Sequence, residues 1–110
     1  MISAVARAAT TSDVFNAIAE PRRREILTLL ALDERSVGDI VDALECAQPS
    51  VSKHLRVLSD VGLVRARRDG KRILYRTNAE NIKPLHEWAG TFQQLWKSQL
   101  SRVKARAEAK

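Results

Sequence analysis

The chain has 110 residues, which suits a single domain with one hydrophobic core. Its formal net charge of +6 favours an acidic partner, with nucleic acid before an anionic membrane surface. A single cysteine argues against a disulfide framework and is compatible with a reducing cytoplasm. The sequence has no apolar run near the roughly 18 residues that span a bilayer, and no signal-peptide pattern. We therefore expect a cytoplasmic protein that has no membrane partner.

Charge is unevenly distributed along the chain. Residues 33–45 contain five acidic residues and one basic residue, whereas residues 65–76 contain six basic residues and one acidic residue. Residues 97–110 contain five basic residues and one acidic residue. An acidic partner is therefore expected to meet the chain at one of these two basic regions.

The first third of the chain predicts an arm and two helices. Residues 1–11 are small and weakly polar, which predicts a flexible or frayed arm. A helix then starts at Ser12 or Asp13, because either side chain can cap the apolar positions that follow. A second helix, 21–32, begins with a proline, and its arginines at 22–24 lie at the positive end of the helix dipole. Ion pairs of these arginines are favoured over DNA contacts.

Two further helices follow with a very short connection. Ser36 and Asp39 have the spacing of a capping box for a helix that ends at Glu45. The next helix, 49–61, buries an apolar stripe, and the turn 45–48 is short enough to force a steep crossing, as in a helix-turn-helix. Its exposed face carries small polar and basic side chains: Gln48, Ser50, Ser52, Lys53 and Arg56.

Residues 63–77 predict a β-hairpin. Asp69 and Gly70 join the two strands, and this pair is favoured where both central positions of a tight turn need positive φ. The expected packing side consists of Leu63, Val64, Ile73 and Tyr75. Basic residues concentrated at one tip favour a phosphate-binding wing over scattered solvated charges. The wing residues are Arg67, Arg68, Lys71 and Arg72.

From Asn81 to about residue 103 the sequence predicts one long helix, with Pro84 tolerated in its first turn. An apolar band follows it at spacings of three and four residues and contains both tryptophans. A core of this size cannot cover the whole band, so pairing with a second copy is favoured over an intramolecular cap. Residues 104–110 form a basic tail. The expected dimer interface comprises Phe15, Leu85, Trp88, Phe92, Leu95, Trp96 and Leu100.

Four segments together resemble the winged helix-turn-helix repressors of the ArsR/SmtB type: FNAIAEPRRREILTLL, SVGDIVDAL, QPSVSKHLRVLSDVGLV and RRDGKRILYR. The resemblance covers roughly residues 12–103, and QPSVSKHLRVL is its most specific part. It implies a mainly helical domain with a small hairpin, in the order four helices, two strands and one helix, that forms a homodimer through its terminal helices. It also implies a transcriptional repressor, in some cases an autorepressor, bound to an inverted-repeat operator on double-stranded DNA.

The family's DNA-reading positions fall on Gln48, Ser50, Ser52, Lys53, His54 and Arg56, and its wing falls on residues 67–72. Glutamine and serine can meet base edges, while lysine and arginine can meet guanine or phosphate. In a two-fold dimer the two reading helices should lie about one DNA turn, ~34 Å, apart. Ala47 stands where the family often has serine, so this helix is expected to lack one N-terminal cap.

Metal-sensing members commonly carry a Cys-x-Cys pair in the third helix or Asp and His clusters in the last. Here the third helix has no cysteine and the last offers only His86 and Glu87, so we expect neither a metal site nor a cofactor. A metal- or redox-responsive switch is the alternative, although packing is favoured for the lone Cys46. Another alternative is a basic module that binds RNA or an anionic membrane through residues 97–110. No residue pattern suggests an enzyme.

Overall fold

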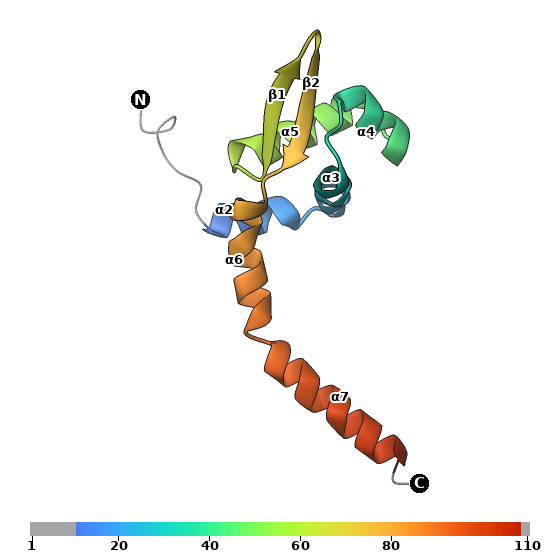
Figure 1. Ribbon diagram of the computed structural model, residues 1–110, viewed down its shortest axis with the longest axis vertical. Coiled ribbons are helices and arrows are strands. Elements are labelled where there is room, and N and C mark those ends of the chain that lie inside the picture. Colours follow the sequence, from blue (N-terminus) through green and yellow to red (C-terminus); the bar gives the residue numbers. More distant parts are fainter. Residues whose placement is uncertain (1–10, 109–110) are drawn as a thin grey trace.

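The computed structural model describes residues 11–108, so nearly all of the expected N-terminal arm lies outside the described residues. Within this range, four helices precede a two-stranded hairpin and two helices follow it (Figure 1). The mainly helical fold with a small hairpin is confirmed, with a difference at the last predicted helix. The elements are α2 (Thr11–Ile18), α3 (Pro21–Leu32), α4 (Val37–Leu44), α5 (Gln48–Asp60), β1 (Val64–Asp69), β2 (Arg72–Thr77), α6 (Ala79–Gly90) and α7 (Gln93–Glu108).

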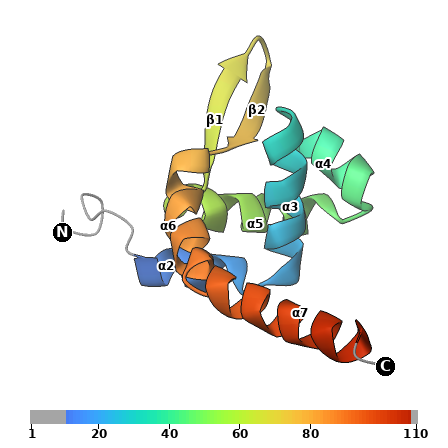
Figure 2. The same ribbon diagram turned by 60° about the horizontal axis from the view of Figure 1, so that its bottom comes forward.

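The hydrophobic core is formed by α2, α3, α4, α5 and the base of the hairpin, which gather around one another in Figure 2. Apolar residues at spacings of three and four turn one face of each helix inward. A fully buried Leu, Ile or Val side chain contributes roughly 1.5–3 kcal/mol, so this set supplies most of the stabilisation of the domain. Its members are Val14, Ala17, Ile26, Leu27, Leu30, Ile40, Val51, Leu55, Leu58, Leu63 and Val64.

The connection between α4 and α5 is as short as predicted. Glu45 takes a left-handed conformation with φ of 52°, and the Cys46 N–H donates to the Val41 carbonyl at 3.3 Å. Ala47 occupies the N-cap of α5 and provides no side-chain cap, as expected. The chain therefore passes from α4 to α5 within three residues, and the two helices pack against each other.

Ser36 and Asp39 form the predicted capping box at the start of α4. The Asp39 N–H donates to Ser36 Oγ, and the Ser36 N–H donates to Asp39 Oδ2, each at 3.2 Å. The backbone N–H of Ser36, followed by its hydroxyl, lowers the pKa of the Asp39 carboxyl. Because this pKa is lowered in the folded state, the stabilisation is present above the ordinary carboxyl pKa and is lost as the pH falls through the folded-state value.

Ser36→Ala is expected to lower the free energy of unfolding by about 1 kcal/mol, because α4 loses a side-chain cap. Urea unfolding at neutral pH measures this loss. Ser98→Ala, at an exposed position of α7, is the matched control and should stay within about 0.5 kcal/mol of the parent protein. Equal losses in the two variants would show that the cap does not stabilise α4.

The hairpin turn differs from the predicted one. Asp69 pairs with Arg72 at the end of the ladder, so the two central residues are Gly70 and Lys71 rather than Asp69 and Gly70. Gly70 has φ of 64°, and it is the only one of the two with positive φ. A turn with glycine at its first central position needs positive φ there alone, which removes the requirement that favoured an Asp-Gly centre.

The prediction of the side of the hairpin that packs against the core was also partly wrong. Ile73 is 44% exposed, whereas Leu74 is buried. Successive side chains of a strand point to opposite faces, so Ile73 and Leu74 cannot both face the core, and the face of Leu74 is the buried one. On the edge away from β1, the backbone of Arg35 pairs with Tyr75 through two hydrogen bonds of 2.8 and 3.1 Å. The strand β2 therefore has a neighbour on both edges near Tyr75, whereas Ile73 lies nearer the tip.

The single helix predicted for residues 81–103 is two helices, α6 and α7, separated at Thr91 and Phe92. The N–H groups of Thr91 and Phe92 donate to carbonyls three residues back, and the Thr91 hydroxyl donates to the Trp88 carbonyl at 2.7 Å. These bonds, next to Gly90 with its low helix propensity, end α6. In Figure 1, α7 projects from the body at the end opposite the hairpin, and it continues to Glu108 into the expected basic tail.

Candidate nucleic-acid interface

The exposed face of α5 contains the residues that the sequence predicted there. Val51, Leu55 and Leu58 hold the helix to the core. Because these residues recur at spacings of four and three, the remaining positions face outward over about three turns. The exposed side chains are Gln48, Ser50, Ser52, Lys53 and Arg56, and His54 is partly buried at the edge of this face.

His54 is linked to α3 by a hydrogen bond. Arg23 Nε donates to His54 Nδ1 at 3.3 Å. Burial lowers the pKa of His54 below the ordinary histidine value, and the nearby Arg23 and Lys53 lower it further, while the negative charge of Glu20 opposes them. The imidazole is therefore held in its neutral form over a wider pH range than a solvated histidine.

The three arginines at the start of α3 have partners, as predicted, but only one of the three forms an ion pair. Arg22 lies 3.1 Å from Glu25. Arg23 and Arg24 instead donate to carbonyls at the C-terminal end of α2, where helix carbonyls have no partner within the helix. The acceptors are Ala17 for Arg23, at 3.2 Å, and Ile18 and Ala19 for Arg24, at 2.7 and 3.3 Å.

The wing residues divide into a free tip and a paired base. The side chains of Arg68 and Lys71 are exposed and form no hydrogen bond or ion pair with any described residue. Arg72 lies 3.8 Å from Asp69, a weak ion pair on the surface. Arg67 is engaged: its Nε and Nη2 donate to the two carboxylate oxygens of Glu34 at 2.7 and 2.8 Å. The structure therefore favours Arg68 and Lys71 over Arg67 as ligands for an anion.

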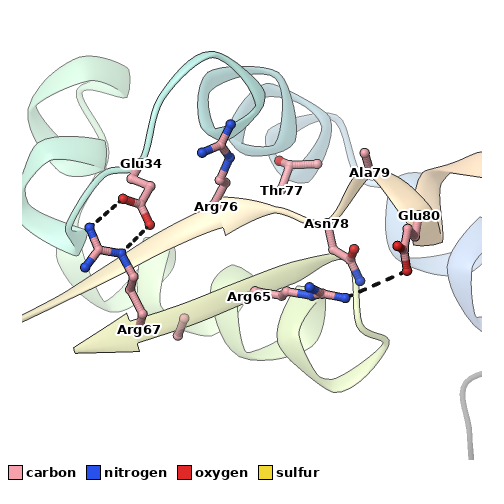
Figure 3. A pocket seen from close by; sticks show the side chains of 9 residues that line it. Glu34, Arg65, Arg67, Arg76, Thr77, Asn78, Ala79 and Glu80 are labelled. Carbon is pink, nitrogen blue, oxygen red and sulfur yellow. Dashed lines mark hydrogen bonds and ion pairs between the residues drawn. The ribbon is translucent and has the colours of Figure 1, made fainter. Parts of the chain in front are cut away.

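The bidentate pair fastens β1 to the loop between α3 and α4 (Figure 3). The hydrogen bond from Arg67, followed by its charge, lowers the pKa of Glu34, and the same bond raises the pKa of Arg67. Two parallel bonds between a guanidinium and a carboxylate fix orientation as well as distance. Glu34 is not predicted from the sequence, because it pairs with a residue 33 positions away.

The base of the wing contains an open cavity of about 460 Å³ (Figure 3). Arg65 and Arg76 stand opposite each other in the strand register, and Arg65 lies 3.9 Å from Glu80. Together with Arg67 they place three arginines around the cavity, of which two face a carboxylate. The charge counted along residues 65–76 therefore overstates the free positive charge, which lies mainly toward the tip.

Comparison with known proteins connects this geometry to a family. The model described as "Bacterial regulatory protein, arsR family" matches residues 20–66. The transcriptional repressor SdpR of Bacillus subtilis (strain 168) is 33% identical over 81 residues, which cover 74% of this chain and 90% of that protein. This chain belongs to the ArsR family.

Solved structures of this family share the fold. The ArsR-like transcriptional regulator from Rhodococcus sp. RHA1 is 27% identical, with a TM-score of 0.69, over 90% of this chain and 91% of that one. The homodimeric winged helix-turn-helix DNA-binding domain Mb0332 from Mycobacterium bovis is 36% identical, with a TM-score of 0.64, over 76% and 77%. This chain covers only part of two other curated relatives, 61% of the length of one and 47% of the length of the other. The prediction of a winged helix-turn-helix DNA-binding regulator is confirmed.

The apolar band of this ArsR-family chain has two parts. Phe15, Trp88 and Phe92 form a cluster in which Trp88 contacts each phenylalanine edge-to-face, with centroids 5.3 Å apart. Leu85 packs against the core of its own domain. The remaining predicted interface residues lie on α7 and are largely exposed: Leu95 at 49%, Trp96 at 70% and Leu100 at 67%.

Cys46 is partly buried against the core, and its thiol donates to the Leu44 carbonyl at 3.5 Å, in keeping with a packing role. Across residues 11–108, no group of three or more His, Cys, Asp or Glu side chains is arranged to hold a metal ion. His86 is exposed on α6. None of the helices in the same range is long and apolar enough to cross a membrane.

Proposed function

We propose that this ArsR-family protein is a dimeric, sequence-specific repressor that binds an inverted-repeat operator in the cytoplasm. The observation that carries the proposal is the exposed polar and basic face of α5, together with the tip of the hairpin that follows it, where the side chains of Arg68 and Lys71 have no partner among the described residues. A helix of this width enters the major groove, and a basic hairpin next to it reaches the backbone or the minor groove. No metal or cofactor takes part in this proposal.

The two sets of side chains have different roles in this proposal. Gln48 and Ser52 read base edges, because an amide and a hydroxyl can pair with donors and acceptors in the major groove. Lys53 and Arg56 contact guanine or phosphate, and Arg68 and Lys71 contact phosphate. Ser50 and His54 contribute at the edge of the helix face, and Arg72 supports the wing tip.

Dimerisation completes the site, because one α5 covers only half of an inverted repeat. The cluster of Phe15, Trp88 and Phe92 and the exposed α7 residues provide an apolar surface that a single copy leaves open. Large apolar patches on soluble domains usually mark interfaces. The Mycobacterium bovis domain, which shares this fold and is a homodimer, supports a dimer.

Binding to DNA from the genomic region upstream of the coding sequence tests the proposal. At about 0.15 M salt, we expect an affinity for one segment at least about 10³-fold higher than for random duplex, the lower end for specific regulators. Equal affinity for all duplexes would rule out sequence-specific repression.

Glu34→Gln is expected to release Arg67 toward DNA. One additional phosphate contact would tighten non-specific binding several-fold at low salt and steepen the salt dependence by about one charge. The substitution should also remove the part of the pH dependence of the free energy of unfolding that comes from Glu34. In the parent protein the lowered pKa of Glu34 stabilises the fold above the ordinary carboxyl pKa, and this is lost as the pH falls through the folded-state value.

A salt titration of DNA affinity measures the release of Arg67, and urea unfolding at neutral and acid pH measures the linkage. Glu87→Gln, at an exposed position of α6 without a described partner, removes the same charge and is the control. A salt slope that changes equally in both variants would show only an effect of net charge.

A further inference from the structure

We infer that Arg23 is a positioning residue that holds His54 with its proton on Nε2, so that α5 offers DNA a neutral N–H donor at this position. The inference rests on the proposed function of α5 as the DNA-reading helix. It assigns Arg23, which the sequence placed among structural ion pairs, an indirect role in recognition.

The hydrogen bond determines the tautomer. Arg23 Nε donates to His54 Nδ1 at 3.3 Å. A guanidinium is always charged and has no lone pair to accept with, so Nδ1 must be the acceptor. A neutral imidazole carries one proton, which therefore resides on Nε2.

Burial is the main effect that lowers the pKa of His54 and so opposes the doubly protonated ring. The negative charge of Glu20, at the N-cap of α3, acts in the opposite direction, and the positive charges of Arg23, Lys53 and Arg22 add to the effect of burial. Protonation of Nδ1 would break the bond from Arg23 and leave two cations in contact. The neutral ring is therefore the form that fits this position.

Arg23 is itself held at a fixed place. Its Nη1 donates to the Ala17 carbonyl at 3.2 Å, at the end of α2, so one side chain joins α2, α3 and α5. The same helix α2 carries Phe15, which contacts Trp88 in the proposed dimer surface. The orientation of His54 on the reading helix is thus tied to the helix that lies in that surface.

The remaining ring nitrogen supplies the chemistry that DNA would meet. His54 lies at the edge of the exposed face of α5, one residue after Lys53. A single N–H donor there fits a phosphate oxygen or the acceptors O6 and N7 of guanine. It does not fit the exocyclic amino groups of adenine or cytosine, which are donors.

Two substitutions separate the two ring nitrogens. His54→Asn keeps an acceptor near the position of Nδ1 and removes the outer donor, whereas His54→Gln keeps an amide donor near Nε2 and removes the acceptor for Arg23. We expect the asparagine variant to lose about tenfold in operator affinity and the glutamine variant to lose less, since a hydrogen bond to a charged partner is worth about that factor. Equal affinities for the two variants would overturn the donor role.

Arg23→Met and Arg24→Met form the matched pair for the positioning role. Both arginines donate to carbonyls of α2, but Arg23 alone bonds His54. We expect Arg23→Met to weaken operator binding about tenfold and Arg24→Met to change it less than about twofold. Equal losses would show that capping of α2, and not His54, is responsible.

Nitrogen-15 NMR of the imidazole in the free protein tests the tautomer without DNA. The parent protein and Arg24→Met should show a protonated Nε2 and a lone pair on Nδ1, and Arg23→Met should show a mixture that titrates nearer the ordinary histidine value. A protonated Nδ1 in the parent protein would overturn the inference. This readout is independent of operator binding, so failure of the proposed function and failure of the tautomer are distinguishable.

Discussion

Trp96→Glu is expected to convert the dimer into a monomer and to weaken operator binding by about 100-fold, the usual scale for a tryptophan at the centre of an interface. Trp96 is 70% exposed on a single copy, so the substitution removes little from the core of the domain. In the dimer it would place an unpaired carboxylate in an apolar contact, which is strongly unfavourable. Light scattering after size-exclusion chromatography measures the mass, and fluorescence anisotropy measures the affinity.

Ser98→Glu is the control for this prediction. It adds the same charge to α7 two residues further on, at a position that points away from Trp96 around the helix. The control should remain a dimer and keep its DNA affinity within about twofold, as expected for a surface substitution. If Trp96→Glu also remained a dimer, the apolar band of α7 would have another occupant and the dimer surface would lie elsewhere.

Gln48→Ala and Lys71→Ala are expected to weaken binding in different ways. Loss of Gln48 removes a possible bidentate contact to adenine and should lower the preference for operator over random duplex by about tenfold, with little change in salt dependence. Loss of Lys71 should weaken binding to operator and random duplex alike and reduce the salt slope by about one.

Affinity for both duplexes over a range of salt concentrations measures both effects. The pair is informative because both side chains are exposed and contribute nothing to the core. If the two variants behaved alike on every duplex, the division between base reading on α5 and phosphate contact at the wing tip would be wrong.

The helices and the helix-turn-helix could be predicted because their signals are local. The capping box of Ser36 and Asp39 lies within four residues, and the stripe of Val51, Leu55 and Leu58 repeats within one helix. Such patterns fix an element and its buried face without knowledge of the rest of the chain. The reading face of α5 followed from the same stripe, because the positions left over had to be exposed.

The differences arise where distant segments meet. Leu74 is buried next to the point where Arg35 pairs with β2, and Arg67 is engaged by Glu34, 33 residues away. The link from Arg23 to His54 spans 31 residues. No local spacing reveals such pairs, so the sequence overstated the free charge of the wing and missed what orients the reading helix.

A hydroxyl-radical footprint on DNA selected from the upstream region tests the central claim most directly. We predict two protected half-sites related by a two-fold axis, with centres about 10–10.5 base pairs, or a multiple of that, apart. We also predict that one dimer binds each operator in the same samples. A single asymmetric protected segment, or protection without preferred position, would contradict a two-fold dimer that reads an inverted repeat through α5.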